Sequence, residues 1–356
     1  MKVFLVTGSY PPDVCGIGHY TYRFAETLEG AGAEVHVISG RGWGIKRVVQ
    51  VIRRVGFSRG NLLHIQYPTE GFGWSLAPQA LALLRPCVVT IHEFSRVHPL
   101  RKLAIMALFL CGRRLIFTSE HERNVALSII PWIRNRSAVI EIGSNIPLPA
   151  EWPPRRFDEI MYFGLVAPNK GIEQVIELAT LIAERNLPLR VRMVGATVPR
   201  FRRYADELRE SAKSLPIQLD LDHDDEETGE IIGGAAVAYL PFPEGATIGR
   251  GSLKALLTCG VAIITTRGKQ ISPELADAVL FAAGPAEALQ SALKLLRDRQ
   301  LLKQLSERAR AYSETFDWNK IARAHMETYR LFAGSTEPAE STQPAGYVIR
   351  SEKHSR

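Results

Sequence analysis

Long apolar runs and signal-like segments are scarce in this sequence of 356 residues. The longest apolar run, LAIMALFLC at 103–111, is less than half the roughly 20 residues that a membrane-spanning helix needs. The opening MKVFLVTG lacks the charged, apolar and small-residue order of a signal peptide, because its apolar stretch is short and rich in strand-forming residues. We therefore expect a protein that does not cross a bilayer and stays in the cytoplasm.

Cysteine is also rare, and its spacing argues against the usual cysteine-based sites. None of the four cysteines, Cys15, Cys87, Cys111 and Cys259, has the C-x-x-C spacing of a zinc site, and a disulfide framework is not indicated either. The acidic run DLDHDDEE at 220–227 contains D-x-D pairs, but it precedes a predicted helix, whose N-terminus favours acidic residues. We predict buried cysteines, no metal site and no cofactor.

Acidic residues are outnumbered, and the surplus of positive charge narrows the range of partners. The formal net charge is +7 and the isoelectric point is near 9.3, which favours phosphorylated ligands or an anionic membrane face. Within IKRVVQVIRRVGF at 45–57, helical spacing puts Val48, Val51, Ile52 and Val55 on one face, with basic residues around it. Two interpretations stay open: a helix that only covers a sheet, and a surface that contacts anionic lipid or a lipid diphosphate at the inner face of a membrane.

Short apolar runs that alternate with helical segments predict a doubly wound α/β fold with parallel sheets. The strands expected in the first half are 3–8, 34–40, 62–67, 87–92, 114–119 and 138–143. The proline-rich segment PLPAEWPPRRFD at 147–158 suits a linker, and a second series follows it with strands at 159–164, 189–195, 236–242, 261–266 and 279–283. We expect domains at 1–150 and 151–332, and a disordered polar tail at 333–356.

The loop YPPDVCGIGHYT at 10–21 separates the first strand from the first helix. Its Gly16 and Gly18 do not form a dinucleotide fingerprint, because that motif follows its strand directly and seven residues intervene here. Glycines at the start of a helix let backbone N–H groups approach a ligand, so we predict that this loop helps to hold a ligand in a cleft between the domains. The alternative is a plain glycine turn that only admits the helix.

Six segments, taken in order, bring a family into view. They are SYPPDVCGIGHYTYRFAETL, VVTIHEF, IEIGSNIP, FGLVAPNKGIEQVIELA, EGATIGRGSLKALLTCGVAIITT and FDWNKIARAHMETY. Together they resemble the retaining, nucleotide-sugar-dependent glycosyltransferases of the GT-B fold, in the group that contains sucrose and phosphatidylinositol-mannoside transferases. The resemblance covers about residues 1–332.

This resemblance implies two facing Rossmann-like domains with an interdomain cleft, and a last helix that packs back on the N-terminal domain. It also implies a nucleotide diphosphate sugar as donor, bound mainly by the second domain without a required metal. The acceptor would be a glycan or a lipid-linked molecule, in cell-surface polysaccharide or glycoconjugate synthesis. We expect no nucleic-acid partner and a peripheral contact with an anionic membrane.

Candidate site residues follow the ends of predicted strands. The resemblance places His92 beside the donor sugar as the catalytic histidine, where a neutral imidazole bonds a hydroxyl or polarises the reacting centre. His64 and His19 are weaker candidates. Lys170 precedes a helix, so its ammonium and the helix N-terminus can converge on phosphate oxygens. For His92, the competing interpretation is a histidine whose ring is only hydrogen-bonded by nearby backbone. For Lys170, it is an exposed surface lysine without a ligand.

Because the resemblance implies a nucleotide-sugar donor, Gly16 and Gly18 become donor-binding candidates, and a second set lies in EGATIGRGS. Glu244 and Gly245 offer a carboxylate and backbone amides to sugar hydroxyls, and Arg250 and Ser252 offer a guanidinium and a hydroxyl to an anion at a helix start. The competing interpretation of the second pair is a helix cap with a solvated arginine.

Two departures from the family's pattern separate this sequence from its relatives. The arginine usually found five residues before the lysine is Leu165 here, and the usual second glutamate is Ser252 or Ala255, depending on the alignment. Two alternatives to a glycosyltransferase therefore stay open: a nucleotide-sugar epimerase of the same fold, and a non-catalytic GT-B subunit of a glycan-synthesis complex.

Overall fold

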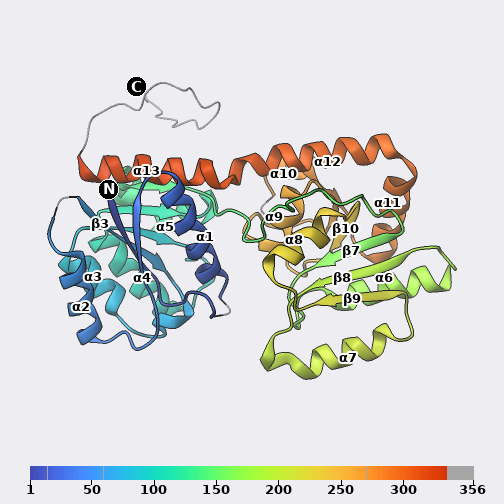
Figure 1. Cartoon of the computed structure of the whole chain (residues 1–356), viewed down its shortest axis with the longest axis horizontal. Coiled ribbons are helices and arrows are strands. Elements are labelled where there is room, and N and C mark those ends of the chain that lie inside the picture. The colour runs from blue at the N-terminus through green and yellow to red at the C-terminus, as the bar shows by residue number, and fades with distance from the viewer. Residues whose placement is uncertain (14, 59, 270, 335–356) are drawn as a thin grey trace.

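A computed structural model describes residues 1–334 except 14, 59 and 270 (Figure 1). Most of the predicted tail, residues 335–356, lies outside the described part of the chain. The rest forms two α/β domains side by side, with the last long helices running along one side of both (Figure 1). Among the described residues, no helix is both long and apolar enough to cross a membrane.

The first domain contains a six-stranded parallel sheet in the order β2-β1-β3-β4-β5-β6. Its strands are β1 Lys2–Val6, β2 Glu34–Ile38, β3 Asn61–Tyr67, β4 Cys87–Ile91, β5 Arg114–Phe117 and β6 Ser137–Val139. Its helices are α1 Gly16–Gly30, α2 Ile45–Val55, α3 Ala77–Leu84, α4 Pro99–Cys111 and α5 Glu120–Ile129, with short 3-10 turns η1 Glu70–Phe72 and η2 Pro131–Arg136.

The two faces of this sheet are covered by different helices. Alternate strand residues such as Leu63 and Ile65 pack with apolar side chains of α2, α3, α4 and α5. The intervening residues, Leu62 among them, pack with α1 and with the C-terminal helix. Since side chains alternate along a strand, each strand contributes to both cores, which explains why the sequence shows nearly continuous apolar runs.

The second domain contains another six-stranded parallel sheet, in the order β12-β11-β10-β7-β8-β9. Its strands are β7 Glu159–Phe163, β8 Arg190–Gly195, β9 Ile217–Leu221, β10 Val237–Leu240, β11 Ala262–Thr265 and β12 Leu280–Phe281. Its helices are α6 Ile172–Glu184, α7 Arg202–Ala212, α8 Asp225–Gly233, α9 Gly251–Thr258, α10 Pro273–Ala278, α11 Pro285–Arg297 and α12 Arg299–Ser313, with turns η3 Pro199–Phe201 and η4 Glu314–Phe316. The expectation of two doubly wound parallel sheets is confirmed.

The strand β9 was missing from the expected strands. Every residue of β9 is only half-buried, and Gln218 and Asp220 interrupt its apolar pattern. Asp220 instead pairs with Arg192 of the neighbouring β8, at 2.7 Å between carboxylate and guanidinium. A strand near the edge of a sheet that uses charged pairs across strands does not show the continuous apolar run of a central strand.

After η4 the chain returns to the first domain as α13 Trp318–Ala333, which packs on α1 (Figure 1). The segment 140–158 that joins the two sheets is held beside it: the Trp318 indole donates to the Ser144 carbonyl at 2.7 Å. The Lys254 ammonium of α9 is fully buried, donates to the Ile142 carbonyl and lies 4.9 Å from the Phe316 ring centroid. The predicted division at residue 150 falls within this connecting segment.

Candidate active site

The carboxyl ends of strands from both sheets meet where the two domains contact each other. Arg96, in the loop after β4, donates to the Glu244 carboxylate at 2.9 Å, and Glu244 lies in the loop after β10. At the start of α1, the Gly16 carbonyl accepts from the Asn145 amide at 3.2 Å. In parallel α/β sheets, ligands bind at the carboxyl ends of the strands, so this interdomain junction is the candidate site.

Acidic residues at the start of α8 face α1 across the same junction. Asp225 lies 3.7 Å from the His19 ring and raises the pKa of that histidine by hydrogen bonding, while Glu226 contacts Arg23 at 3.4 Å. Asp224 caps α8 by accepting from the Glu227 amide at 2.8 Å. The acidic run therefore caps a helix and bridges the domains.

No group of acidic, histidine or cysteine side chains suited to a metal ion occurs within the described residues.

The two candidate glycines of the first loop differ in how tightly they are packed. A Cβ added at Gly18 would lie 3.1 Å from the Ser9 backbone and 3.2 Å from the Tyr10 nitrogen, whereas one at Gly16 would meet nothing within 4 Å. Gly18 therefore allows α1 to approach the loop after β1 closely. The carbonyl of Gly16, in contrast, already bonds the Asn145 side chain of the connecting segment.

His92 comes directly after β4 and is held by contacts on several sides. Its Nε2 lies 2.8 Å from the Gln66 Oε1, its backbone nitrogen donates to Tyr67, and the edge of its ring meets Tyr20 at 5.1 Å between centroids. Burial, together with nearby His325, lowers the pKa of His92 to about 3. The imidazole is therefore neutral at physiological pH, as expected for a group that bonds a sugar hydroxyl.

Lys170 and Gly171 link the loop after β7 to the loop after β10. Gly171 has a φ of 80°, and a Cβ there would lie 1.8 Å from the Pro241 carbonyl oxygen, so only glycine fits. This packing holds Lys170 beside the loop that carries Glu244. The Lys170 ammonium makes no hydrogen bond or ion pair with any described residue, so its charge is available to an anion.

Glu244, Gly245 and Arg250 lie in the loop between β10 and α9, and Ser252 lies in the first turn of α9. Arg250 donates to the Glu244 carboxylate at 3.2 Å and covers the Phe242 ring at 5.1 Å. Gly245 has a φ of 84°, and a Cβ there would lie 2.3 Å from the Gly268 Cα. Arg250 precedes α9, and Ser252 is the second residue of that helix. Glu244 is thus shared by two arginines, one from each domain.

Reasoning from the sequence missed two residues that the structure brings to this junction. Arg96 stands four residues after His92 in the same strand-end loop, and this position could have identified it as a candidate. Gln66 is fully buried and contacts His92, but a single glutamine in an apolar strand gives no signal in the sequence. Leu165 is 43% exposed and offers no charge; the cations that contact Glu244 are Arg96 and Arg250, and Lys170 lies beside the same loop.

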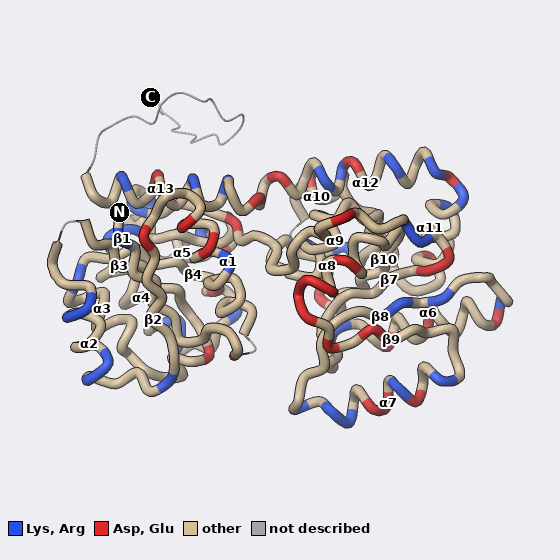
Figure 2. The backbone as a smooth tube through the Cα atoms, viewed as in Figure 1, with Lys and Arg blue, Asp and Glu red and all other residues tan. Residues whose placement is uncertain are grey.

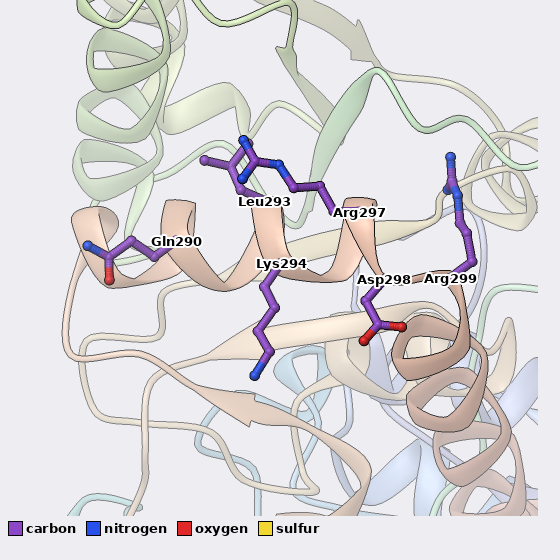
Figure 3. Close-up of a pocket in the computed structure, with 6 residues that line it drawn as sticks. All are labelled: Gln290, Leu293, Lys294, Arg297, Asp298 and Arg299. Atoms are coloured by element: carbon purple, nitrogen blue, oxygen red, sulfur yellow. The ribbon is translucent and has the colours of Figure 1, made fainter.

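Two surface hollows elsewhere are less suitable as active sites. One of about 690 Å3 is lined by α11 and the start of α12, where Lys294 and Asp298 project to one side and Leu293 and Arg297 to the other (Figure 3). The other, of about 640 Å3, lies beside the segments that precede β7 and β8. In the first hollow, the charged side chains point in different directions. The second hollow lies at the amino ends of the strands, away from the junction.

Comparison with solved structures shows the fold. HepE from Anabaena, in complex with UDP and glucose, matches with a TM-score of 0.68 and 14% identity over 92% of this chain and 99% of that one. A glycosyltransferase from Rickettsia africae gives 0.70, with 14% identity over 93% and 98%. Sucrose-phosphate synthase from Thermosynechococcus elongatus gives 0.67, with 16% identity over 94% and 100%. No family model and no curated protein matches the sequence. The chain therefore has the GT-B fold that its sequence motifs led us to expect.

Proposed function

We propose that this protein is a retaining glycosyltransferase that moves a sugar from a nucleotide diphosphate sugar to a glycan or lipid-linked acceptor in cell-surface polysaccharide or glycoconjugate synthesis. The observation that carries the proposal is the convergence of Arg96, Arg250 and Glu244 from strand ends of both domains. A diphosphate supplies the anion that such arginines bind best, and a carboxylate beside it accepts hydrogen bonds from sugar hydroxyls.

The charges at the junction suggest how the donor is held. The Glu244 carboxylate pairs with both Arg96 and Arg250, which leaves one positive charge uncompensated among the three groups. A bound diphosphate takes over these arginines together with Lys170, and the freed carboxylate then accepts from the sugar. The two arginines and Lys170 thus supply the positive charge that is missing at Leu165. One of these arginines, Arg96, comes from the opposite domain. Arg96 thereby links donor binding to contact between the domains.

The transfer step needs few protein bases. The acceptor hydroxyl attacks the anomeric carbon on the face that the diphosphate leaves, the bond from that carbon to the phosphate oxygen breaks, and the departing phosphate takes the hydroxyl proton. Preorganised cations at the leaving group stabilise the charge that develops there. His92, neutral because of burial, contributes a hydrogen bond to a hydroxyl rather than a proton. The likeness to HepE with UDP and glucose makes UDP-sugars the donors to test first.

An acceptor in a membrane is supported by the outer side of α2, α3 and α4, which we call the three-helix face. α3 packs between α2 and α4, and apolar side chains on the outer side of all three are exposed. They are Ile45, Val49, Leu83, Leu84, Leu100, Leu103 and Leu110, with Phe57, Trp74 and Leu76 in the adjoining loops. Single exposed apolar residues are ordinary, but a concentration on one face marks a binding surface.

The charge of this region supports an anionic membrane as its partner. Between Glu34 and Glu120 the sequence has twelve Lys and Arg but only two acidic residues, Glu70 and Glu93. Lys and Arg lie along α2, which carries no acidic residue (Figure 2). Exposed leucine, tryptophan and phenylalanine beside basic groups are suited to the interface of an anionic bilayer. We therefore place the peripheral membrane contact on the three-helix face.

Vesicle sedimentation tests this contact. The protein should bind phosphatidylcholine vesicles that contain phosphatidylglycerol and should not bind phosphatidylcholine alone. Lys46→Glu with Arg53→Glu, or Leu103→Ser with Leu110→Ser, should abolish binding. Arg202→Glu with Arg203→Glu on α7 changes charge by the same amount and should leave binding intact. Absence of vesicle binding, equal loss in the α7 control, or self-association through this face would each contradict the assignment.

Nucleotide binding tests the main proposal. A thermal-shift screen with UDP, GDP, ADP and their sugars should find at least one nucleoside diphosphate that stabilises the protein, by roughly 2.7 kcal/mol at 100 times its dissociation constant. Turnover of the sugar nucleotide without any acceptor would favour the epimerase alternative. No stabilisation by any nucleotide would favour the non-catalytic subunit.

A further inference from the structure

A buried row of polar side chains connects His92 to the C-terminal helix. His64 and Gln66 of β3 and Thr90 of β4 lie on the sheet face that α1 and α13 cover, while their neighbours Leu63 and Ile65 face the opposite core. His64 and Gln66 are fully buried and Thr90 is 1% exposed. Burying polar groups is costly unless they are hydrogen-bonded, so the contacts among them determine whether the row is stable.

The contacts form one continuous chain. His92 Nε2 lies 2.8 Å from Gln66 Oε1, and Gln66 Nε2 lies 3.3 Å from His64 Nε2. His64 Nε2 also lies 2.7 Å from Thr90 Oγ1, and His64 Nδ1 lies 2.6 Å from the Tyr329 hydroxyl of α13. The chain of hydrogen bonds thus runs from the strand end at the domain junction to a helix that reaches this sheet after the second domain.

This chain allows one consistent placement of the protons. An amide oxygen can only accept, so His92 must carry its proton on Nε2 and donate it to Gln66. The Gln66 amide nitrogen can only donate, so His64 accepts at Nε2, where the Thr90 hydroxyl donates as well, and carries its own proton on Nδ1, which donates to Tyr329. The Nδ1 of a neutral His92 therefore keeps its lone pair, and it has no hydrogen-bond partner among the described residues.

The groups packed around His92 oppose its protonation. Burial and the other histidines lower the pKa of His64, and burial lowers the pKa of His325 to about 4. Tyr20 and Tyr329 are buried, and burial raises the pKa of both hydroxyls, so neither supplies a negative charge. His325 Nδ1 donates to the Ile321 carbonyl at 2.9 Å, and its Nε2 is buried without a partner. No anion in this cluster stabilises an imidazolium.

We propose that Gln66, fixed by His64, Thr90 and Tyr329, is a positioning residue that holds His92 as the Nε2–H tautomer and so makes Nδ1 an acceptor for a hydroxyl of the bound sugar or acceptor. The inference rests on the proposed function for the identity of the ligand. The tautomer itself depends only on the contacts above. In consequence, α13 contributes to the geometry of the candidate active site although Tyr329 does not touch it.

Nitrogen NMR of the histidine rings tests the tautomer without any substrate. In the natural protein, the His92 signals, assigned by their loss in His92→Asn, should be those of a neutral ring protonated on Nε2, from neutral pH down to about pH 5. Gln66→Ala should convert them to a mixture of tautomers. Thr265→Val, an equally buried change in the other sheet, where the Thr265 hydroxyl donates to the Leu240 carbonyl at 2.7 Å, should leave them unchanged.

Measuring kcat and KM at two pH values provides a second test of the positioning role of Gln66. Gln66→Glu places an acceptor with a negative charge beside the His92 Nε2–H, which should raise the pKa of His92 into the assay range. The variant should lose kcat by at least about tenfold at pH 6 and recover in part at pH 8, with KM changed less than about twofold. A pH-independent loss would indicate a structural defect only.

The outcomes separate the two proposals. A His92 ring protonated on Nδ1, or unchanged ring signals in Gln66→Ala, would overturn the positioning role whatever the protein transfers. The predicted tautomer together with no transfer from any sugar nucleotide would overturn the proposed function and leave the hydrogen-bond chain intact. Should Gln66→Ala not fold, the ring signals of Gln66→Glu can still be compared with those of Thr265→Val.

Discussion

Replacing Arg250 with alanine should weaken binding of a nucleoside diphosphate much more than binding of its nucleoside. The guanidinium is mostly buried, packs on Phe242 and contacts Glu244 at 3.2 Å. Charge-assisted hydrogen bonds to a phosphate contribute roughly 1.5 to 3 kcal/mol, which corresponds to about 10- to 150-fold in dissociation constant. We expect the upper part of this range, because the variant also leaves Glu244 with one cation instead of two beside the incoming anion.

Isothermal titration with UDP and with uridine measures the two losses separately. Arg250→Ala with Glu244→Ala should recover part of the lost UDP affinity, since the uncompensated carboxylate is then removed as well. Arg203→Ala is the matched control, because Arg203 also pairs with a glutamate, at 3.0 Å, but on α7. Equal losses for UDP and uridine would indicate a general structural role for Arg250, and no loss for either would show that Arg250 does not bind the diphosphate.

Three further predictions concern other parts of the molecule. His92→Ala should lower turnover by at least about tenfold, or roughly 1.4 kcal/mol of barrier, with nucleotide affinity nearly intact by titration; unchanged turnover would end its assignment. Gly18→Val should lower both donor use and the melting temperature, since its side chain would meet backbone near 3.1 Å, whereas Gly16→Ala should change melting little. Burial lowers the pKa of Lys254 to about 8 from 10.5, so the unfolded chain keeps this proton to higher pH and the free energy of unfolding should rise between pH 8 and 10.5. Denaturant titrations of Lys254→Met should lack that rise, and an identical pH slope in both proteins would contradict the shift.

The order of elements and most strands could be predicted from the sequence, because central parallel strands must be apolar on both faces. β4, ending at Ile91, and β10, ending at Leu240, have every residue buried and stood out as continuous apolar runs. β9 did not, because Asp220 serves a charged pair with Arg192. Strand ends were therefore predictable, and with them the positions of His92 and Glu244.

The pairing of side chains across the junction could not be predicted. Arg96 and Glu244 are separated by 148 residues, and nothing local in the sequence indicates which arginine meets which carboxylate. The same holds for Tyr329 and His64, which are 265 residues apart. Such contacts depend on how α13 returns to the first domain, a tertiary feature that residue spacing does not encode.

Release of nucleoside diphosphate from a sugar nucleotide is the decisive measurement of glycosyl transfer. With the donor found by thermal shift and a glycan or membrane-lipid acceptor fraction, release should depend on the acceptor, be lost in Arg250→Ala and fall at least about tenfold in His92→Ala. Release that is equal in these variants, or absent with every donor and acceptor although the protein is folded, would contradict the account.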